Sequence, residues 1–187
     1  MINRELIRIK IVQLTYAYYQ NGNHNMNNAE KELMFSLSKS YDLYNYLLLL
    51  IVAISKEMRR RVDVLTSKAK REGLPLPSEK FVNNRFALQL ENNKMLLDYI
   101  DEKKLTWHDD IEAVRRLCNT IEQSQMYQEY MASDEDNYES DRELWRKIYK
   151  TLICDNADLD ALLEEKSLYW NDDKEVVDTF VLKTIKR

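Results

Sequence analysis

Two arginines near the start of the chain are the residues best suited to bind a ligand. Arg4 and Arg8 share one face of a helix, and Thr15 and Tyr19 fall on the same stripe at about 100° per residue. Guanidinium is always charged and binds oxyanions through a planar fork of donors. Tyr19 adds a ring beside Arg8 that can stack on an unpaired base. We interpret the stripe as a phosphate-binding candidate, and the alternative is the solvated face of a terminal helix.

A second basic group lies in the segment 56–71, where seven lysines and arginines stand against two acidic residues. Lys56, Arg59 and Arg60 join the candidates because a basic pole on a chain of net charge −4 attracts polyanions while the acidic remainder limits non-specific binding. Most of that acidity is in residues 132–187, with nine basic against fifteen acidic residues. The alternative is a solvated helix end whose cations the helix dipole favours.

Patterns of catalysis and metal binding are missing from the sequence. It has no glycine-rich phosphate loop, no Gly-x-Ser-x-Gly elbow and no His-Glu-x-x-His. His108 precedes two aspartates, a setting more typical of a helix start than of a metal site. Cys118 and Cys154 lack metal-ligand spacing, and two unpaired thiols fit a reducing cytoplasm. We expect no enzyme activity, no cofactor, no metal and a cytoplasmic location.

The elements that position these residues are predicted to be helices. Two glycines and two prolines in 187 residues leave few tight turns, so an all-α, multi-helix bundle is expected. The apolar run 47–54 is far shorter than the ~20 residues that span a bilayer, and we assign it to a buried core helix. Helices are expected over the following residues: 3–20, 28–38, from 40 to about 71, 79–103, 106–131, from 140 onward, 158–167 and 172–187.

Several helix ends and buried positions are predicted from residue type. Asn28, Ser40 and Asn171 are expected N-caps, and Ser140-Asp-Arg-Glu143 reads as a capping box. The first helix has apolar residues on nearly every face except the arginine stripe, so we expect it to be buried on most sides. Core spacing also predicts burial of these side chains: Tyr16, Tyr41, Tyr44, Leu48, Ile51, Met58, Val62, Leu65, Trp145 and Tyr149.

The chain is expected to divide at one proline-containing and one acidic linker. Both prolines of the Gly73-Leu-Pro-Leu-Pro77 stretch prevent a helix from continuing. The predicted organisation is an N-terminal helical subdomain (1–72), a linker (73–80), a helical hairpin (81–131), an acidic linker (132–139) and a C-terminal helical segment (140–187).

The pattern Arg4-x-x-x-Arg8-x-x-x-Val12-Gln13-x-x-Tyr16 near a chain start resembles the opening of the bacterial transcription antitermination factor NusB. The resemblance covers residues 2–61, is faint over 80–132 and returns weakly over 141–173. It implies a NusB-like N-terminal helical subdomain followed by a second helical subdomain.

The resemblance also implies a function. In that family an arginine-bearing N-terminal helix contributes to binding the boxA element of RNA, together with the ribosomal protein partner NusE on elongating RNA polymerase. It therefore assigns RNA binding to Arg4 and Arg8, and we extend that interpretation to Tyr19 and to the basic residues after position 55. No membrane partner is expected.

The sequence departs from the family at its end, where the Asn-Glu pair and the late Asn-Gly step of the family are absent. A piece of a longer family member and a divergent relative both fit this departure. Two other functions stay open. One is a NusB-like RNA-targeting module of an rRNA methyltransferase, and the other is a helical protein-interaction scaffold.

Overall fold

The computed structural model describes residues 4–20 and 25–187, and within these ranges the chain forms helices and no strand. The expected all-α, multi-helix bundle is confirmed. Its elements are α1 (Arg4–Gln20), α2 (Met26–Glu72), α3 (Arg85–Glu91), α4 (Lys94–Lys103), α5 (Ile111–Gln123), α6 (Gln125–Ala132), α7 (Tyr138–Ile148), the π-helical turn η1 (Tyr149–Ile153), α8 (Ala157–Lys166) and α9 (Leu168–Lys186). None of these described helices is long and apolar enough to cross a membrane.

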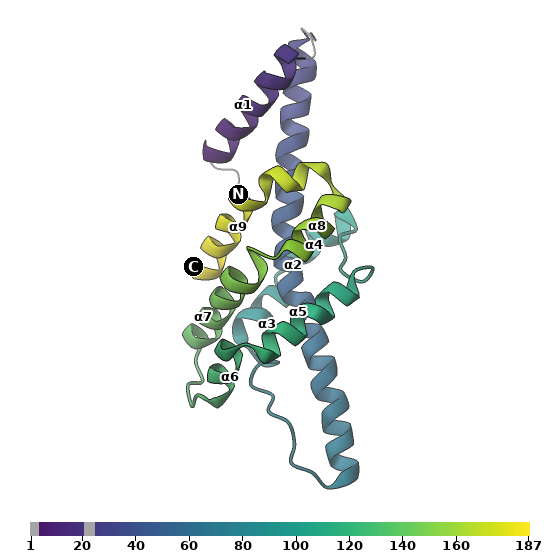
Figure 1. Ribbon diagram of the computed structural model, residues 1–187, viewed down its shortest axis with the longest axis vertical. Coiled ribbons are helices and arrows are strands. Elements are labelled where there is room, and N and C mark those ends of the chain that lie inside the picture. Colours follow the sequence, from purple (N-terminus) through teal and green to yellow (C-terminus); the bar gives the residue numbers. More distant parts are fainter. Residues whose placement is uncertain (1–3, 21–24) are drawn as a thin grey trace.

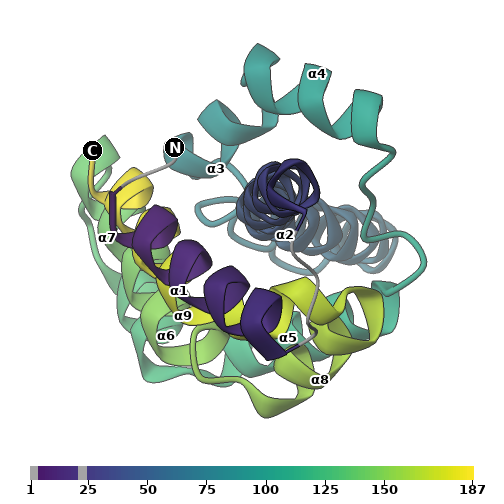
Figure 2. The ribbon, with the colours of Figure 1, turned by 90° about the horizontal axis from the view of Figure 1, so that it is seen from above.

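Helix α2 is the axis of the molecule, and the other helices pack along it (Figures 1 and 2). Its 47 residues give it a length of about 70 Å at 1.5 Å per residue. The predicted apolar run lies at its centre, where Leu47, Leu50, Ile51 and Ile54 are fully buried, so the assignment to a core helix is confirmed. The largest fully buried side chain, Trp145 of α7, belongs to the same core. One continuous core joins α2 to the later helices as far as Ile185, because α2 has neighbours on several sides.

The break that we predicted in α2 around residues 38–40 is absent. The helix begins after Asn25, whose side chain accepts from the backbone N–H groups of the first turn, and not at Asn28. Ser40 is a buried mid-helix residue: its hydroxyl lies 3.1 Å from the Ser36 carbonyl and 2.6 Å from the Asp173 carboxylate. A serine can remain inside a helix when its hydroxyl bonds the carbonyl four residues earlier.

Gly73 ends α2 in the left-handed conformation, with φ +67° and its N–H bonded to the carbonyl of Ala69. A Cβ there would meet no atom within 4 Å, so the cost of a side chain is conformational and not steric crowding by neighbours. We expect Gly73→Ala to lower the free energy of unfolding by about 1 kcal/mol, and Gly73→Asn to lower it less, because asparagine tolerates this conformation better. Urea unfolding of the three proteins measures the difference. Equal losses for alanine and asparagine would contradict this explanation.

The segment 81–131 is four helices, not the predicted hairpin. The expected helix 79–103 is interrupted where Asn93 caps α4 by accepting from Leu96 N–H, and the expected helix 106–131 is interrupted where Ser124 caps α6. Asparagine and serine compete with the helix by bonding nearby backbone N–H groups, which makes such breaks local events that a hydrophobic period does not reveal.

The last two predicted caps are also displaced. Asn137 caps α7 in place of the expected box at Ser140, and Asp141 is buried, accepting from the Tyr130 hydroxyl and from the backbone N–H of Arg85. Helix α9 starts at Leu168, before the expected cap at Asn171. Among the apolar positions, Leu65 is 53% exposed because the end of α2 extends beyond the bundle (Figure 1), so its predicted burial is wrong.

Candidate functional site

Helix α1 is held against the first part of α2 by one face (Figure 1). Leu6 packs with Leu37 of α2 and Phe180 of α9 in a small apolar cluster separate from the main core. One turn later Lys10 forms a buried ion pair with Asp173 of α9, with 2.5 Å between Nζ and Oδ1 and both side chains almost inaccessible to solvent. Leu6 and Lys10 are the buried residues of α1, and they fix the rotation of the helix about its axis.

The sequence predicted that α1 is buried on most sides, but its remaining faces are largely exposed. Tyr16 and Val12 are each 68% exposed and Ile11 is 46% exposed. The predicted core position of Tyr16 is therefore wrong. The reason is the arrangement in Figures 1 and 2: α1 and the start of α2 project beyond the bundle, so α1 meets its neighbours on one side. The exposed face thus carries apolar and aromatic side chains as well as cations.

The predicted stripe lies on this exposed face. Arg4, Arg8 and Tyr19 are all exposed, and the Tyr19 side chain is 74% accessible. Within residues 4–20 and 25–187, neither arginine forms an ion pair with a carboxylate. Both guanidinium groups therefore keep their donors available to a ligand.

An apolar groove borders the stripe where α1 faces the beginning of α2. It has a volume of about 450 Å³, and its lining includes Leu14 and Tyr18 of α1, Met26 and Leu33 of α2, and Tyr19 at its edge. Cationic donors and an apolar slot therefore belong to the same helix, with the arginines in its first half and the slot along its second half. A ligand with anionic groups and flat apolar rings fits this combination.

The second predicted group lies elsewhere and is engaged in ion pairs. Arg59 binds Glu91 through both terminal nitrogens, at 3.3 and 3.0 Å, and Lys56 lies 3.7 Å from the same carboxylate. The hydrogen bond from Arg59 is the main reason why the pKa of Glu91 is lowered. Arg60 also donates two hydrogen bonds to one carboxylate, from Nε and Nη2 to the two oxygens of Glu57, at 2.9 and 2.8 Å.

The structure does not bring the two predicted groups together. Leu37, which packs against Leu6 of α1, precedes Lys56 by 19 positions on one straight helix, a separation of about 28 Å. Sequence reasoning had no means of measuring this distance because it requires knowing which part of α2 receives α1.

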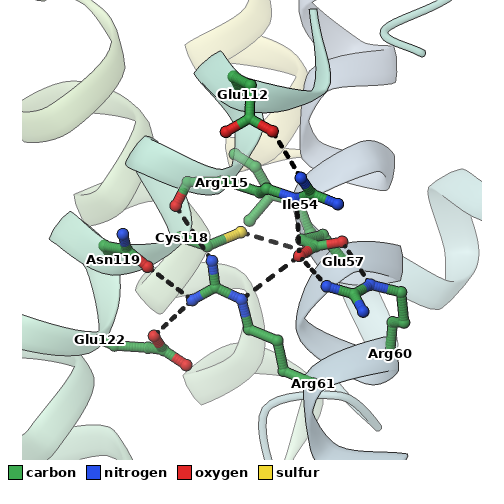
Figure 3. A network of polar contacts seen from close by, with 9 residues as sticks. All are labelled: Ile54, Glu57, Arg60, Arg61, Glu112, Arg115, Cys118, Asn119 and Glu122. Carbon is green, nitrogen blue, oxygen red and sulfur yellow. Dashed lines mark hydrogen bonds and ion pairs between the residues drawn. The ribbon is translucent and has the colours of Figure 1, made fainter.

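Sequence reasoning missed the polar network around Glu57, which joins α2 to α5 (Figure 3). The Glu57 side chain is 4% exposed and lies within 3.6 Å of guanidinium nitrogens of Arg60, Arg61 and Arg115. Arg61 also reaches across to the Glu122 carboxylate at 2.7 Å. The hydrogen bond from Arg60 lowers the pKa of Glu57 more than burial raises it. Arg60 and Arg61 follow Glu57 by three and four positions, a spacing that could have predicted their ion pairs with it. Nothing in the sequence indicated that Arg115 of α5 would join them.

The two thiols and His108 are not part of a metal-binding group within the described residues. Among residues 4–20 and 25–187 no three His, Cys, Asp or Glu side chains are placed to share a metal ion. The His108 side chain is 91% exposed. Cys118 and Cys154 are free, and burial raises the pKa of each thiol to about 12, which keeps both protonated and weakly nucleophilic.

Comparison with known proteins adds no relative: no family model matches the chain, and neither a curated protein nor a solved structure is significantly similar to it.

Proposed function

We propose that this chain is an RNA-binding transcription antitermination factor of the NusB type, and that α1 contacts the RNA. The observation that carries the proposal is the exposed face of α1, where Arg4 and Arg8 have no carboxylate partner in the described part of the chain and where Tyr16 and Tyr19 are exposed farther along the same helix. Cations bind the phosphates and aromatic rings stack on bases, which is how proteins hold single-stranded nucleic acid.

The anchoring of α1 supports the same proposal. Because Lys10 and Leu6 fix the helix on α2 and α9, the guanidinium groups of Arg4 and Arg8 are carried on an ordered support and not on a free terminus. A preordered site loses less conformational entropy when it binds. The apolar groove next to Tyr19 offers a place for one unstacked base.

The identity of the RNA and of the partner rests on the resemblance of residues 2–61 to the family. We propose a short boxA-like element, bound in the cytoplasm together with the ribosomal protein NusE on elongating RNA polymerase. The net charge of −6 over residues 132–187 favours a basic protein partner for the C-terminal helices, since complementary charge accelerates association and disfavours wrong partners. Lys56, Arg59 and Arg60 stay predicted RNA contacts, but their carboxylate partners make them secondary to α1.

Arg8→Ala is expected to weaken binding of a boxA-like RNA by about 1–3 kcal/mol, or roughly 5- to 150-fold, without changing the fold. The physical reason is the loss of one charge-assisted contact from an exposed side chain. Fluorescence anisotropy with labelled RNA, at two salt concentrations and with and without the ribosomal partner, measures the affinity. The slope of the logarithm of affinity against the logarithm of salt concentration should also decrease by about one, the change expected for the loss of one phosphate contact.

Arg116→Ala is the matched control, because Arg116 is an exposed arginine of α5 that has no ion pair among the described residues. Its affinity should equal that of the unaltered chain. Equal losses for the two variants would mean that binding follows net charge alone, and no loss for Arg8→Ala would contradict a role of α1 in binding RNA.

A further inference from the structure

A cavity of about 420 Å³ opens between the middle of α2, the end of α4 and the loop that leads to α5. Its walls are apolar, formed by Val52, Ala53, Ile100, Leu105, Trp107 and Ile111. Four titratable side chains line it, the basic residues Lys56, Arg60 and His108 and the acidic residue Glu57. Pockets of this volume with mostly apolar walls and a few polar groups are typical of small-molecule sites.

Arg60 lines this cavity, and its guanidinium group is paired with Glu57 (Figure 3). Its Nε and Nη2 donate to the two oxygens of Glu57, whose carboxylate is buried and also faces two further guanidinium groups. Its Nη1 has no hydrogen-bond partner in the ranges that the structure describes. One edge of the guanidinium is therefore used for positioning while the other donors stay available.

Lys56 provides a second positive charge at the same cavity. Its side chain is 57% exposed, and its ion pair with Glu91 is long, at 3.7 Å, so the ammonium group can turn toward a ligand. Glu57 is the acidic residue of the cavity lining, and its charge is balanced by the surrounding arginines. The electrostatic setting therefore favours an anion over a cation.

We propose that this cavity binds a small molecule that has an apolar body and a single oxyanion, a carboxylate or a phosphate. The apolar body occupies the space between Ala53, Ile100 and Trp107, and the oxyanion accepts from Arg60 Nη1 and Lys56 Nζ. Burial of the apolar part supplies most of the affinity, and the charge-assisted contacts fix the orientation.

The site is independent of the RNA surface proposed for α1. Figure 2 shows α1 and α4 on opposite sides of α2. The separation along α2 between the α1 contact at Leu37 and Lys56 is about 28 Å. A ligand in the cavity thus leaves the exposed face of α1 free. It competes only with the secondary RNA contacts Lys56 and Arg60, so RNA binding through α1 and ligand binding in the cavity can fail separately.

The test uses 8-anilinonaphthalene-1-sulfonate, a fluorescent probe with an apolar aromatic body and one sulfonate. Ala53→Trp fills the cavity and should abolish the tightest binding step in a titration with this probe. Ala29→Trp is the matched control, since Ala29 is a similarly half-buried alanine that lines the apolar groove beside α1 and not this cavity. Loss of that step in Ala29→Trp but not in Ala53→Trp would place the probe in the groove and overturn the proposal.

The oxyanion contact is tested by a second variant that leaves the apolar walls intact. Arg60→Gln should weaken the sulfonate probe about tenfold but change the affinity of the neutral analogue N-phenyl-1-naphthylamine by less than about twofold. Equal changes for the two probes would overturn the role of Arg60. Circular dichroism of each variant confirms that it is folded.

Competition identifies the natural oxyanion. Octanoate and octyl phosphate, which share an apolar alkyl body, are titrated separately against the bound sulfonate probe. Stronger displacement by octanoate indicates a carboxylate ligand, and stronger displacement by octyl phosphate indicates a phosphate ligand. Displacement by neither at millimolar concentration would contradict a site for a biological oxyanion.

Discussion

Lys10→Met is expected to detach α1 from the rest of the molecule. Lys10 is the only ion-pair partner of the Asp173 carboxylate in the described ranges, and the variant leaves that carboxylate buried with the Ser40 hydroxyl as its hydrogen-bond donor. Leaving one partner of a buried pair without the other costs about 3–5 kcal/mol. Helix α1 buries one apolar side chain fully, Leu6, which is too little to offset that cost.

The loss should be local because detachment of α1 lets water reach Asp173. Native-state hydrogen exchange measures it: amides of α1 should lose about 100-fold or more of their protection, while those of the Leu47–Ile54 core should change little. Binding of RNA through α1 should weaken in parallel, since Arg4 and Arg8 would no longer be carried on an ordered support. Uniform loss of protection in both regions would contradict this separation.

Two further variants isolate the ion pair. Lys31→Met, at an exposed lysine at the start of α2, should stay within about 0.5 kcal/mol of the unaltered chain. The double variant Lys10→Met with Asp173→Leu should recover most of the protection, because replacing both members of a buried pair by apolar groups is often neutral or stabilising. Failure of the double variant to recover would mean that the lysine acts through packing and not through charge.

Glu57→Gln is expected to lower the free energy of unfolding at pH 7 by about 2–3 kcal/mol. The substitution preserves shape but removes the negative charge that lies between Arg60, Arg61 and Arg115. This value lies below the range for broken buried pairs because these guanidinium groups are partly exposed and can be rehydrated. Urea unfolding measures the change. Glu112→Gln, at a carboxylate that is 70% exposed and that pairs only with Arg115 among the described residues, is the control and should cost less than about 1 kcal/mol.

The same variant should show a weaker dependence of stability on pH in the acidic range. Because the pKa of Glu57 is lowered from 4.5 in the folded chain, its contribution is complete above that value and disappears as the pH falls through the folded pKa. Below that pKa the unaltered chain and Glu57→Gln should therefore converge in stability. A difference that stays constant from pH 7 to pH 3 would contradict a contribution from ionised Glu57.

The fold class followed from features that act locally. Scarcity of glycine and proline predicted long helices, and the run at 47–54 predicted the core, because burial of apolar groups leaves a periodic or continuous trace in the sequence. Continuity of α2 through Ser40 was not predictable. The Ser40 hydroxyl lies between the Ser36 carbonyl and the Asp173 carboxylate, and the second of these is more than 100 residues away in the sequence.

The candidate site was predictable in part. The spacing of Arg4, Arg8 and Tyr19 placed them on one exposed stripe, as the structure has them, while their contact with RNA stays a prediction. The burial predicted for the rest of α1 was wrong because a helical pattern shows which residues are apolar, not how many neighbours the helix has. Lys10 interrupted an apolar run in the sequence, and its role was visible only once Asp173 of α9 was placed beside it.

The central position of α2 has a consequence for the order in which the protein folds during synthesis. The Leu47–Ile54 run is covered in part by α5, where the Cys118 thiol lies against the Ile54 carbonyl, and α5 begins 57 residues after this run, at Ile111. At a synthesis rate of about 5–20 residues per second, the ribosome releases that run roughly 3–11 s before this partner helix begins to be made. The most apolar surface of the chain is therefore exposed on the nascent polypeptide throughout that interval, and it is the segment that a chaperone or an aggregating neighbour meets first.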